Sequence, residues 1–194
     1  MFLQSVTAAE MLSDDDQVQL ARIHLSCLPD AIVSRFGVGY LASMYDYLCR
    51  SKEEVVFVAR EDGVINGSAT ISMARSSFSV RLALKSGLIW QLLMNIWQPR
   101  VMRALLASID DISITVPELV FIFVAPTARQ RGIGARLLEE CDTFLRSVGT
   151  EKYGLRMDAD LGFPAGQLYR KHGFSSIRQF SVGRSTFVWM EKSL

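Results

Sequence analysis

The sequence is poor in the residues that build metal sites and disulfide frameworks. It contains two histidines and three cysteines in 194 residues. The cysteines (Cys27, Cys49 and Cys141) are widely spaced and fall in apolar helical patterns, which is typical of reduced core residues. His24 lies near the apolar stripe of a helix, so we expect a buried core histidine there. We therefore expect neither a disulfide nor a metal ion.

The chain also lacks a dominant charge and a long uninterrupted apolar run. A formal net charge of +1 gives no electrostatic footprint for nucleic acid. The N-terminus has no basic region followed by an apolar segment, so we expect no secretory signal and a cytoplasmic protein. The most apolar stretch, 82–97, is interrupted by Lys85, Gln91 and Asn95 and is too short and polar to span a bilayer.

The length allows one domain with a sizeable core, and we expect a single domain over residues 1–194. Ser13 and the acids after it predict the start of a helix that Pro29 ends. The pair Asp62-Gly63 between two β-type runs predicts a hairpin. Gly67 in its second strand indicates a bulge or a close backbone approach. The other expected elements are a first strand near 2–6, a helix over 37–50, a strand over 152–160, a helix over 164–172 and a closing pair over 175–182 and 186–191.

The stretch 119–138 organises the chain. It begins with an apolar, β-branched run that Pro126 ends, which predicts a buried strand. An amphipathic helix follows, with apolar residues at spacings of three and four up to Val148, and Gly149 lies where a left-handed cap is wanted. The expected strand over 152–160 is parallel to the first because a helix connects them. These patterns predict a fold of the α/β class.

Between this strand and helix lies a basic, glycine-bearing turn, Arg129–Gly134. Gly132 and Gly134 remove side chains where a backbone can approach a ligand closely. The first helical turn offers unpaired N–H groups and the positive end of the helix dipole, which together favour an anion, most often a phosphate. The turn lacks GxxxxGK[ST], and Leu137 occupies the position of the third glycine of a dinucleotide fingerprint. Those two phosphate-binding classes are therefore excluded.

The pattern that fits is [RQ]-x-x-G-x-[GA] after a strand that ends Val-x-Pro. In this respect 124–138 resembles the coenzyme A pyrophosphate loop of the GNAT superfamily of N-acetyltransferases. The resemblance implies a mixed central sheet in which the central strand and its parallel neighbour splay apart after Val124. It also implies acetyl-CoA as the acyl donor, held by main-chain groups and side chains at Phe123, Val124, Arg129, Gln130, Arg131, Gly132, Ile133, Gly134 and Ala135.

A second motif, Ala165–Phe174, resembles the family ending A-x-x-L-Y-x-x-x-G-F. Its Tyr169 matches the tyrosine that can protonate the departing thiolate, and an ordinary phenol pKa near ~10 suits that role. Packing beside Phe174 is the structural alternative. Glu118, at the start of the central strand, matches the position where several family members place a general base; a carboxylate beside an apolar strand would have a raised pKa. A solvated carboxylate is the alternative.

The resemblance implies an acetyl-CoA-dependent N-acetyltransferase that moves an acetyl group to a primary amine by direct attack. We expect a small-molecule acceptor, with an amino sugar or a sugar-linked intermediate among the candidates. Two alternatives stay open, namely a non-catalytic acyl-CoA-binding module with this fold and an acyltransferase that acts on a protein amine. The residues considered for acceptor contact are Phe36, Tyr40, Tyr45, Asp158 and Asp160. Asp158 and Asp160 are also the alternatives to Glu118 as the catalytic carboxylate.

Residues 75–115 form an insertion between the hairpin and the central strand that is longer than an ordinary connection. Their apolar spacing predicts helices, broken near Pro99. Three roles stay open for this insertion. It can pack as a lid over the core, form a homodimer interface through Trp90, Met94 and Trp97, or contact a membrane surface or a lipid-linked acceptor.

Overall fold

The computed structural model describes residues 5–8, 11–74, 116–159, 163–182 and 185–194. Within these residues, seven strands form one sheet in the order β1-β2-β3-β4-β5-β7-β6. All neighbouring strands are antiparallel except β4 and β5, which are parallel. The strands are β1 (Ser5–Ala8), β2 (Glu54–Glu61), β3 (Val64–Ser72), β4 (Glu118–Val124), β5 (Lys152–Asp158), β6 (Ser175–Val182) and β7 (Ser185–Ser193). The fold class predicted from the sequence, a mixed α/β sheet, is therefore confirmed.

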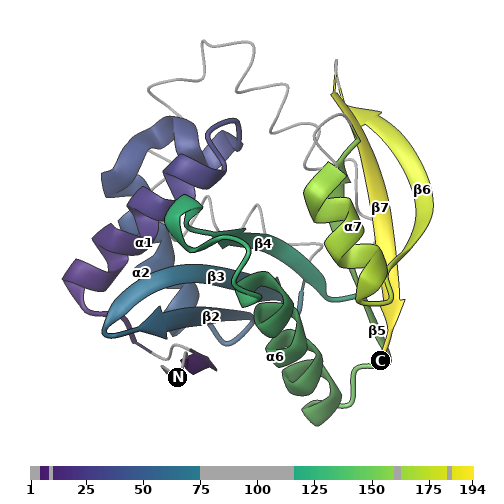
Figure 1. Cartoon of the computed structure of the whole chain (residues 1–194), viewed down its shortest axis with the longest axis horizontal. Helices are drawn as coiled ribbons and strands as arrows, with labels where there is room; N and C mark the ends of the chain where they lie inside the picture. The colour runs from purple at the N-terminus through teal and green to yellow at the C-terminus, as the bar shows by residue number, and fades with distance from the viewer. Residues whose placement is uncertain (1–4, 9–10, 75–115, 160–162, 183–184) are drawn as a thin grey trace.

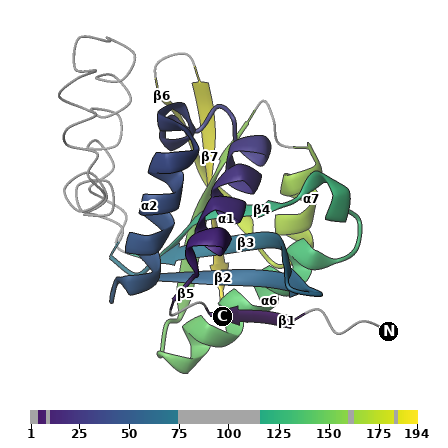
Figure 2. The same ribbon diagram turned by 90° about the vertical axis from the view of Figure 1, so that its left-hand side faces the viewer.

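Helices cover both faces of this sheet, and each face has its own apolar core (Figures 1 and 2). On one face α1 (Asp14–Cys27) and α2 (Gly37–Arg50) pack against β2, β3 and the end of β4, with Leu20, Leu41 and Met44 fully buried between them. On the other face α6 (Ile133–Ser147) and α7 (Phe163–Lys171) pack around Leu137, Leu155 and Met190. The sheet is thus the middle of three layers, as an α/β fold requires.

The first helix begins where its cap signal predicts. The Ser13 hydroxyl accepts a hydrogen bond from the Asp16 N–H, while the Asp16 carboxylate accepts one from the Ser13 N–H. This reciprocal capping box satisfies N–H groups that the first turn leaves open. The Asp16 carboxylate also pairs with Arg60 of β2 at 2.8 Å, which fixes the start of α1 against the sheet.

The hairpin of β2 and β3 is also confirmed, with Asp62 and Gly63 both in the left-handed region at its turn. The close approach of another backbone expected at Gly67 of β3 is confirmed. A β-carbon there would lie 2.8 Å from the Phe123 carbonyl oxygen and 3.3 Å from the Ile133 side chain. The start of α6 therefore packs directly onto the backbone of β3.

The separation of β4 from β5 begins earlier than the sequence predicted. Only Glu118 pairs with Gly154 and Leu119 with Leu155, and no later residues of the two strands pair. The sequence predicted that the strands separate after Val124, but they separate after Leu119, so the predicted position was wrong by most of the length of β4. The cause of this early separation is visible on the other edge of β4, where Val120 is an extra residue in the pairing with β3. Such a bulge bends and twists a strand, which turns the rest of β4 away from β5.

The C-terminal strands are held to α6 by a buried polar contact. Asp142 of α6 accepts a hydrogen bond from the Tyr153 hydroxyl at 2.8 Å and forms an ion pair with Lys192 of β7 at 2.5 Å. Both charged side chains are about nine-tenths buried. The contact joins a helix, a parallel strand and the last strand of the chain.

The predicted insertion over 75–115 lies outside the described residues, and so does Asp160. Among the helices that the structure describes, none is long and apolar enough to cross a membrane.

Candidate active site

The turn before α6 has the geometry of an anion site. Gly132 is the N-cap residue with a φ of 77°, and no side chain caps the helix. The first hydrogen bond of the helix runs from the Arg136 N–H to the Gly132 carbonyl at 3.1 Å. The N–H groups of Ile133, Gly134 and Ala135 precede that bond and have no intrahelical acceptor. An anion placed here would accept these hydrogen bonds and meet the positive end of the helix dipole.

The basic side chains of Arg129–Gly134, which we call the phosphate loop, do not all point at this site. Arg131 Nη2 lies 2.6 Å from both carboxylate oxygens of Glu61 at the end of β2. Arg129 is exposed, and its Nε donates a 3.4 Å hydrogen bond to the Val124 carbonyl oxygen. Gln130 holds a φ of 62°, which turns the backbone toward the helix. Backbone groups, more than the arginines, therefore line the position at which an anion would lie.

A narrow opening lies between the separated strands, and we call it the splayed gap. Its volume is about 100 Å³. Its lining comes from the residue that caps the end of α1 and from β4, β5 and α7: Leu28, Leu119, Val120, Phe121, Ile122, Leu155, Arg156 and Tyr169. Tyr169 reaches it from the α7 face and Leu28 from the α1 face, so the gap connects the two faces of the sheet. A reactant lying in it could be approached from both.

Tyr169 is buried in this gap, with 8% of its surface exposed, and its ring meets Phe174 edge-on at 5.8 Å. Burial raises the pKa of Tyr169 from the ordinary value to about 12. The ordinary pKa expected for Tyr169 from the sequence is therefore too low. The hydroxyl is a weaker acid than expected and stays protonated throughout the neutral range. Tyr169 thus both packs against Phe174 and lines the splayed gap, so the one does not exclude the other.

Glu118 is not a solvated carboxylate. It is 3% exposed, and its Oε1 lies 3.4 Å from the Nε of Arg156 on β5. The two side chains share one face of the sheet, because Glu118 pairs with Gly154 and Arg156 follows two residues later on the same strand. The guanidinium offsets the cost of burying the charge. Glu118 thus directly precedes Leu119, which lines the splayed gap, and its charge is compensated by Arg156, which lines it too.

The residues considered for acceptor contact are only partly brought together. Phe36 lies at the end of the 3₁₀ turn η1 (Ile32–Phe36), and its ring meets the buried Tyr40 ring edge-on at 5.2 Å. Tyr45 is fully buried and hydrogen-bonded to His24, so it belongs to the core. Asp158 ends β5, opposite Phe187 of β7.

His24 is a core residue, as the sequence predicted, and its ring packs against two residues of β4. It is fully buried, its Nδ1 lies 2.6 Å from the Tyr45 hydroxyl, and burial lowers its pKa to about 4. Its ring packs edge-on against Phe121 and Phe123 with centroids 4.9 and 5.2 Å away. Nε2 has no hydrogen-bond partner in the part of the chain that the structure describes. With the Tyr45 hydroxyl as donor to Nδ1, the proton of the neutral ring is on Nε2.

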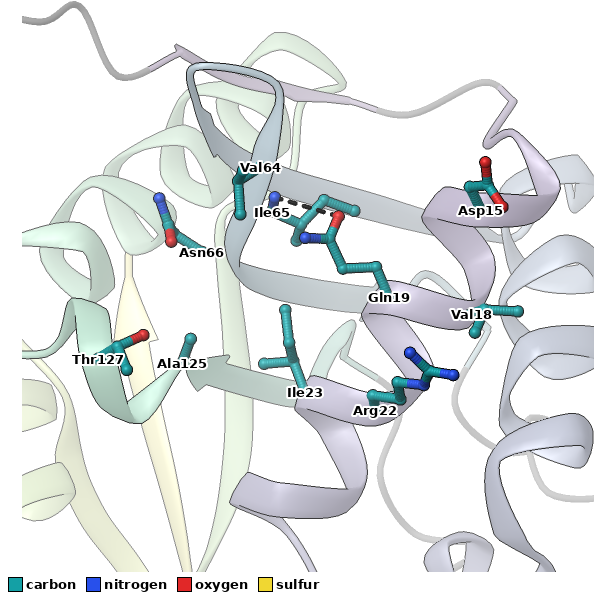
Figure 3. A pocket seen from close by; sticks show the side chains of 10 residues that line it. All are labelled: Asp15, Val18, Gln19, Arg22, Ile23, Val64, Ile65, Asn66, Ala125 and Thr127. Carbon is teal, nitrogen blue, oxygen red and sulfur yellow. Dashed lines mark hydrogen bonds between the residues drawn. The ribbon is translucent and has the colours of Figure 1, made fainter.

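A separate cleft of about 450 Å³ lies on the other side of β4 (Figure 3). It is bounded by α1, the start of β3 and the residues that follow β4: Asp15, Val18, Gln19, Arg22, Ile23, Val64, Ile65, Asn66, Ala125 and Thr127. The Gln19 side chain crosses it and accepts a 3.3 Å hydrogen bond from the Ile65 N–H. β3 and not β5 borders this cleft, and it shares no lining residue with the splayed gap.

Sequence reasoning missed Arg156 and Glu61. Each contacts a predicted residue that lies far away in the sequence, so local spacing gives no signal of the pairing. One pattern pointed to Arg156: Tyr153, Leu155 and Met157 alternate with it along β5, which places one arginine on the opposite face of a largely buried strand. In the described residues no group of three or more His, Cys, Asp or Glu is arranged to hold a metal ion.

A model of the acetyltransferase (GNAT) family matches residues 19–174, and the chain therefore belongs to this family. Family membership indicates an N-acetyltransferase that uses acetyl-CoA. No curated protein matches the chain.

Solved structures share the fold at low sequence identity. A putative acetyltransferase of the GNAT family from Desulfovibrio desulfuricans superposes with a TM-score of 0.66 at 13% identity, over 98% of this chain and 99% of that one. The ribosomal-protein-S18-alanine N-acetyltransferase from Escherichia coli gives 0.60 at 15% identity, over 98% and 94%. PaiA N-acetyltransferase from Thermoplasma acidophilum, in complex with coenzyme A, gives 0.61 at 14% identity, over 98% and 99%. At these identities the likeness shows the fold alone.

Proposed function

We propose that this protein transfers the acetyl group of acetyl-CoA to a primary amine of a small molecule by direct attack. The observation that carries the proposal is the splayed gap, which Tyr169 and Arg156 both line, with Glu118 paired to Arg156. A thioester in the gap would have a hydroxyl donor on its leaving side and a proton acceptor on its attacking side. The recessed position of Glu118 suits a slender or small acceptor.

The phosphate loop fits the pyrophosphate of coenzyme A. The uncapped N–H groups from Gln130 to Ala135 would hold it, and a β-carbon at Gly132 would meet nothing within 4 Å, which leaves room for a ligand. Main-chain groups of Phe123 and Val124 lead from this loop toward the gap. Acetyl-CoA would supply the thioester, and the protein would hold that thioester in the splayed gap.

Glu118 would act on the attacking amine. An amine reaches a protein mainly as an ammonium ion at neutral pH, and it must lose a proton before it can attack. Burial alone disfavours an ionised carboxylate, whereas the adjacent Arg156 guanidinium favours the charged form that can accept a proton. Arg156 is therefore a positioning residue that keeps the base charged and oriented.

Tyr169 would act on the departing sulfur. With its pKa raised to about 12, the phenol is a weaker acid than a typical thiol, whose pKa is about 8.5. Complete proton transfer to the sulfur is therefore unfavourable, but a hydrogen bond from the hydroxyl still stabilises the charge that develops on it. The structure thus favours a hydrogen-bond donor over a full general acid.

Bisubstrate kinetics test the direct attack. With acetyl-CoA and an active amine varied together, the proposal predicts intersecting double-reciprocal lines, together with an unchanged protein mass after incubation with acetyl-CoA alone. Parallel lines with a stable gain of one acetyl group would show a covalent enzyme intermediate and contradict it. Acetyl-CoA binding without any release of CoA across a broad amine panel would favour a non-catalytic module.

A further inference from the structure

The end of the β2–β3 hairpin is attached to the segment that follows β4. Asn66 is a bulge residue of β3, left without a partner between Ile65 and Gly67 in the register with β2. The Asn66 carbonyl oxygen accepts a 2.8 Å hydrogen bond from the Ala125 N–H. This bond holds the hairpin beside the chain that leads from β4 into the phosphate loop.

A second contact joins the same hairpin to the phosphate loop itself. Arg131 Nη2 lies 2.6 Å from both carboxylate oxygens of Glu61, the last residue of β2. The Asn66 side-chain amide lies 3.5 Å from one of these oxygens. The Glu61 side chain is 17% exposed and that of Arg131 is 48% exposed. The contact therefore lies at the surface, with the carboxylate on its inner side.

Arg131 lies between two residues with a left-handed backbone. Gln130 has a φ of 62° and Gly132 has a φ of 77°. Glycine adopts this conformation readily, whereas at Gln130 it is strained and persists only where the surroundings hold it. A contact that fixes the Arg131 side chain therefore also limits the backbone conformations that are open to the loop.

This backbone conformation matters for an anion because the groups that would bind it belong to the main chain. The N–H groups of Ile133, Gly134 and Ala135 have no intrahelical acceptor, and no side chain caps the helix. These groups can bind one anion together only when they point the same way. A loop without a fixed shape would have to be ordered as the ligand binds, which lowers affinity.

We propose that Glu61 is a positioning residue for the acyl donor, which holds the phosphate loop in its anion-binding shape through Arg131. This inference rests on the proposed function, since it places the pyrophosphate of coenzyme A in the loop. Glu61 itself would not touch the ligand. The alternative is that Arg131 attracts the phosphates directly and that Glu61 weakens the attraction. The two differ in sign, because loss of the Glu61 charge weakens donor binding in the first case and strengthens it in the second.

The charge balance at this contact favours positioning. Arg131 is already paired with Glu61, so the pair as a whole carries no net charge. Arg131 is also half exposed, and water and salt screen the attraction of an exposed charge for a phosphate. Loss of the contact should therefore reduce affinity through the loop more than the freed arginine raises it.

A matched pair of substitutions on neighbouring residues tests the sign. Glu61→Gln keeps the shape of the side chain and removes its charge. Asp62→Asn removes a charge of the same sign from the next residue, which is exposed, and asparagine tolerates the φ of 51° at this turn. Calorimetry with acetyl-CoA should show binding weakened about threefold or more in Glu61→Gln and changed by less than that in Asp62→Asn.

A double-mutant cycle and steady-state kinetics complete the test. Arg131→Gln should weaken acetyl-CoA binding as Glu61→Gln does, and the double variant should bind no more weakly than the weaker single variant, since both changes break one contact. In CoA release, Glu61→Gln should raise the KM for acetyl-CoA and leave kcat close to the wild-type value. Unchanged or tighter binding in Glu61→Gln, an equal loss in Asp62→Asn, additive losses in the double variant, or a fall in kcat with KM unchanged would overturn the proposal.

The wild-type protein separates a failure of this inference from a failure of the proposed function. If it binds acetyl-CoA and acetylates an amine while Glu61→Gln binds the donor equally well, acetyl transfer stands and Glu61 has no positioning role. Weaker donor binding in Glu61→Gln, on a protein that releases no CoA with any amine, would support the role of Glu61 and contradict acetyl transfer. No binding of acetyl-CoA to the wild type would overturn both.

Discussion

The carboxylate of Glu118 lies 3.4 Å from the guanidinium of Arg156, measured from Oε1 to Nε, at the point where β4 and β5 begin to separate. The contact joins the proposed base to the edge of the splayed gap. Because Glu118 is 3% exposed, water does not solvate its carboxylate, and the Arg156 guanidinium compensates the charge instead. The pair is therefore both a structural link between the parallel strands and the centre of the proposed proton transfer.

A double-mutant cycle separates these two roles. Glu118→Gln should leave the Arg156 charge poorly compensated and lower the free energy of unfolding by about 3 kcal/mol. Adding Arg156→Gln should restore much of that stability, because no buried charge then lacks its partner. Turnover should fall at least tenfold in both variants. Urea unfolding and CoA release measure the two effects. Turnover that recovers together with stability would show that Glu118 is only structural.

Tyr169→Phe should lower turnover roughly 10- to 100-fold and change the affinity for acetyl-CoA by less than twofold, because the hydroxyl matters only while charge develops on sulfur. Because burial raises the pKa of Tyr169 to about 12, the hydroxyl keeps its proton until the pH approaches that value. Between pH 7 and 10.5, ionisation of Tyr169 should therefore cause no loss of turnover in the wild-type protein. The pH profiles of turnover for the wild type and the Phe variant should have the same shape over this range. Such a loss would mean that the phenol ionises far more easily than its burial implies.

Two glycines at opposite ends of α6 provide a matched test of the phosphate loop. Gly132 and Gly149 have φ values of 77° and 74°, and neither has an atom within 4 Å of an added β-carbon. Alanine at either position should cost about 1–2 kcal/mol of stability, because the left-handed conformation strains it. Only Gly132→Ala should weaken acetyl-CoA binding, by tenfold or more in calorimetry. An equal loss of affinity in Gly149→Ala would indicate a general effect on the helix.

Gly134 is a less direct probe of the same loop. A β-carbon there would lie 3.1 Å from the Leu168 side chain of α7. A bulky residue at 134 would therefore displace the helix that carries Tyr169, and lost activity could not be attributed to the cofactor alone.

His24 should make the protein sensitive to acid. Burial lowers its pKa from 6.5 to about 4, so the unfolded chain takes up a proton before the folded chain does. Its contribution to stability is complete above pH 6.5 and is lost as the pH falls toward 4. At pH 5 the free energy of unfolding should be about 2 kcal/mol lower than at pH 7.5 from this residue. In His24→Gln, urea titrations should show that part of the pH dependence removed; an unchanged slope would assign it to other groups.

Much of the fold could be predicted because its signals are local. Ser13 and Asp16 form the capping box of α1, Asp62 and Gly63 form the hairpin turn, and the apolar spacing after Ile133 defines α6. The shape of the phosphate loop was predictable for the same reason, since a strand, a glycine turn and a helix follow one another directly, while its binding of a phosphate stays a prediction.

The remaining features depend on contacts between distant parts of the chain. The splay begins after Leu119 because Val120 is a bulge in the pairing with β3, and pairing register cannot be read from β4 alone. Likewise, the apolar neighbours of Glu118 indicated a carboxylate in an apolar setting, whereas Arg156 reaches it from β5. The contact of Arg131 with Glu61 at the hairpin end likewise has no signal in the spacing of the loop.

The most direct test of the central claim is amine-dependent release of CoA by the purified protein. Free thiol is followed after mixing with acetyl-CoA and each of a panel of primary amines, and mass spectrometry examines the amine. The account predicts CoA release that requires an amine and an equal amount of N-acetylated product. Tight binding of acetyl-CoA with no amine-dependent release, or release without an acetylated amine, would contradict it.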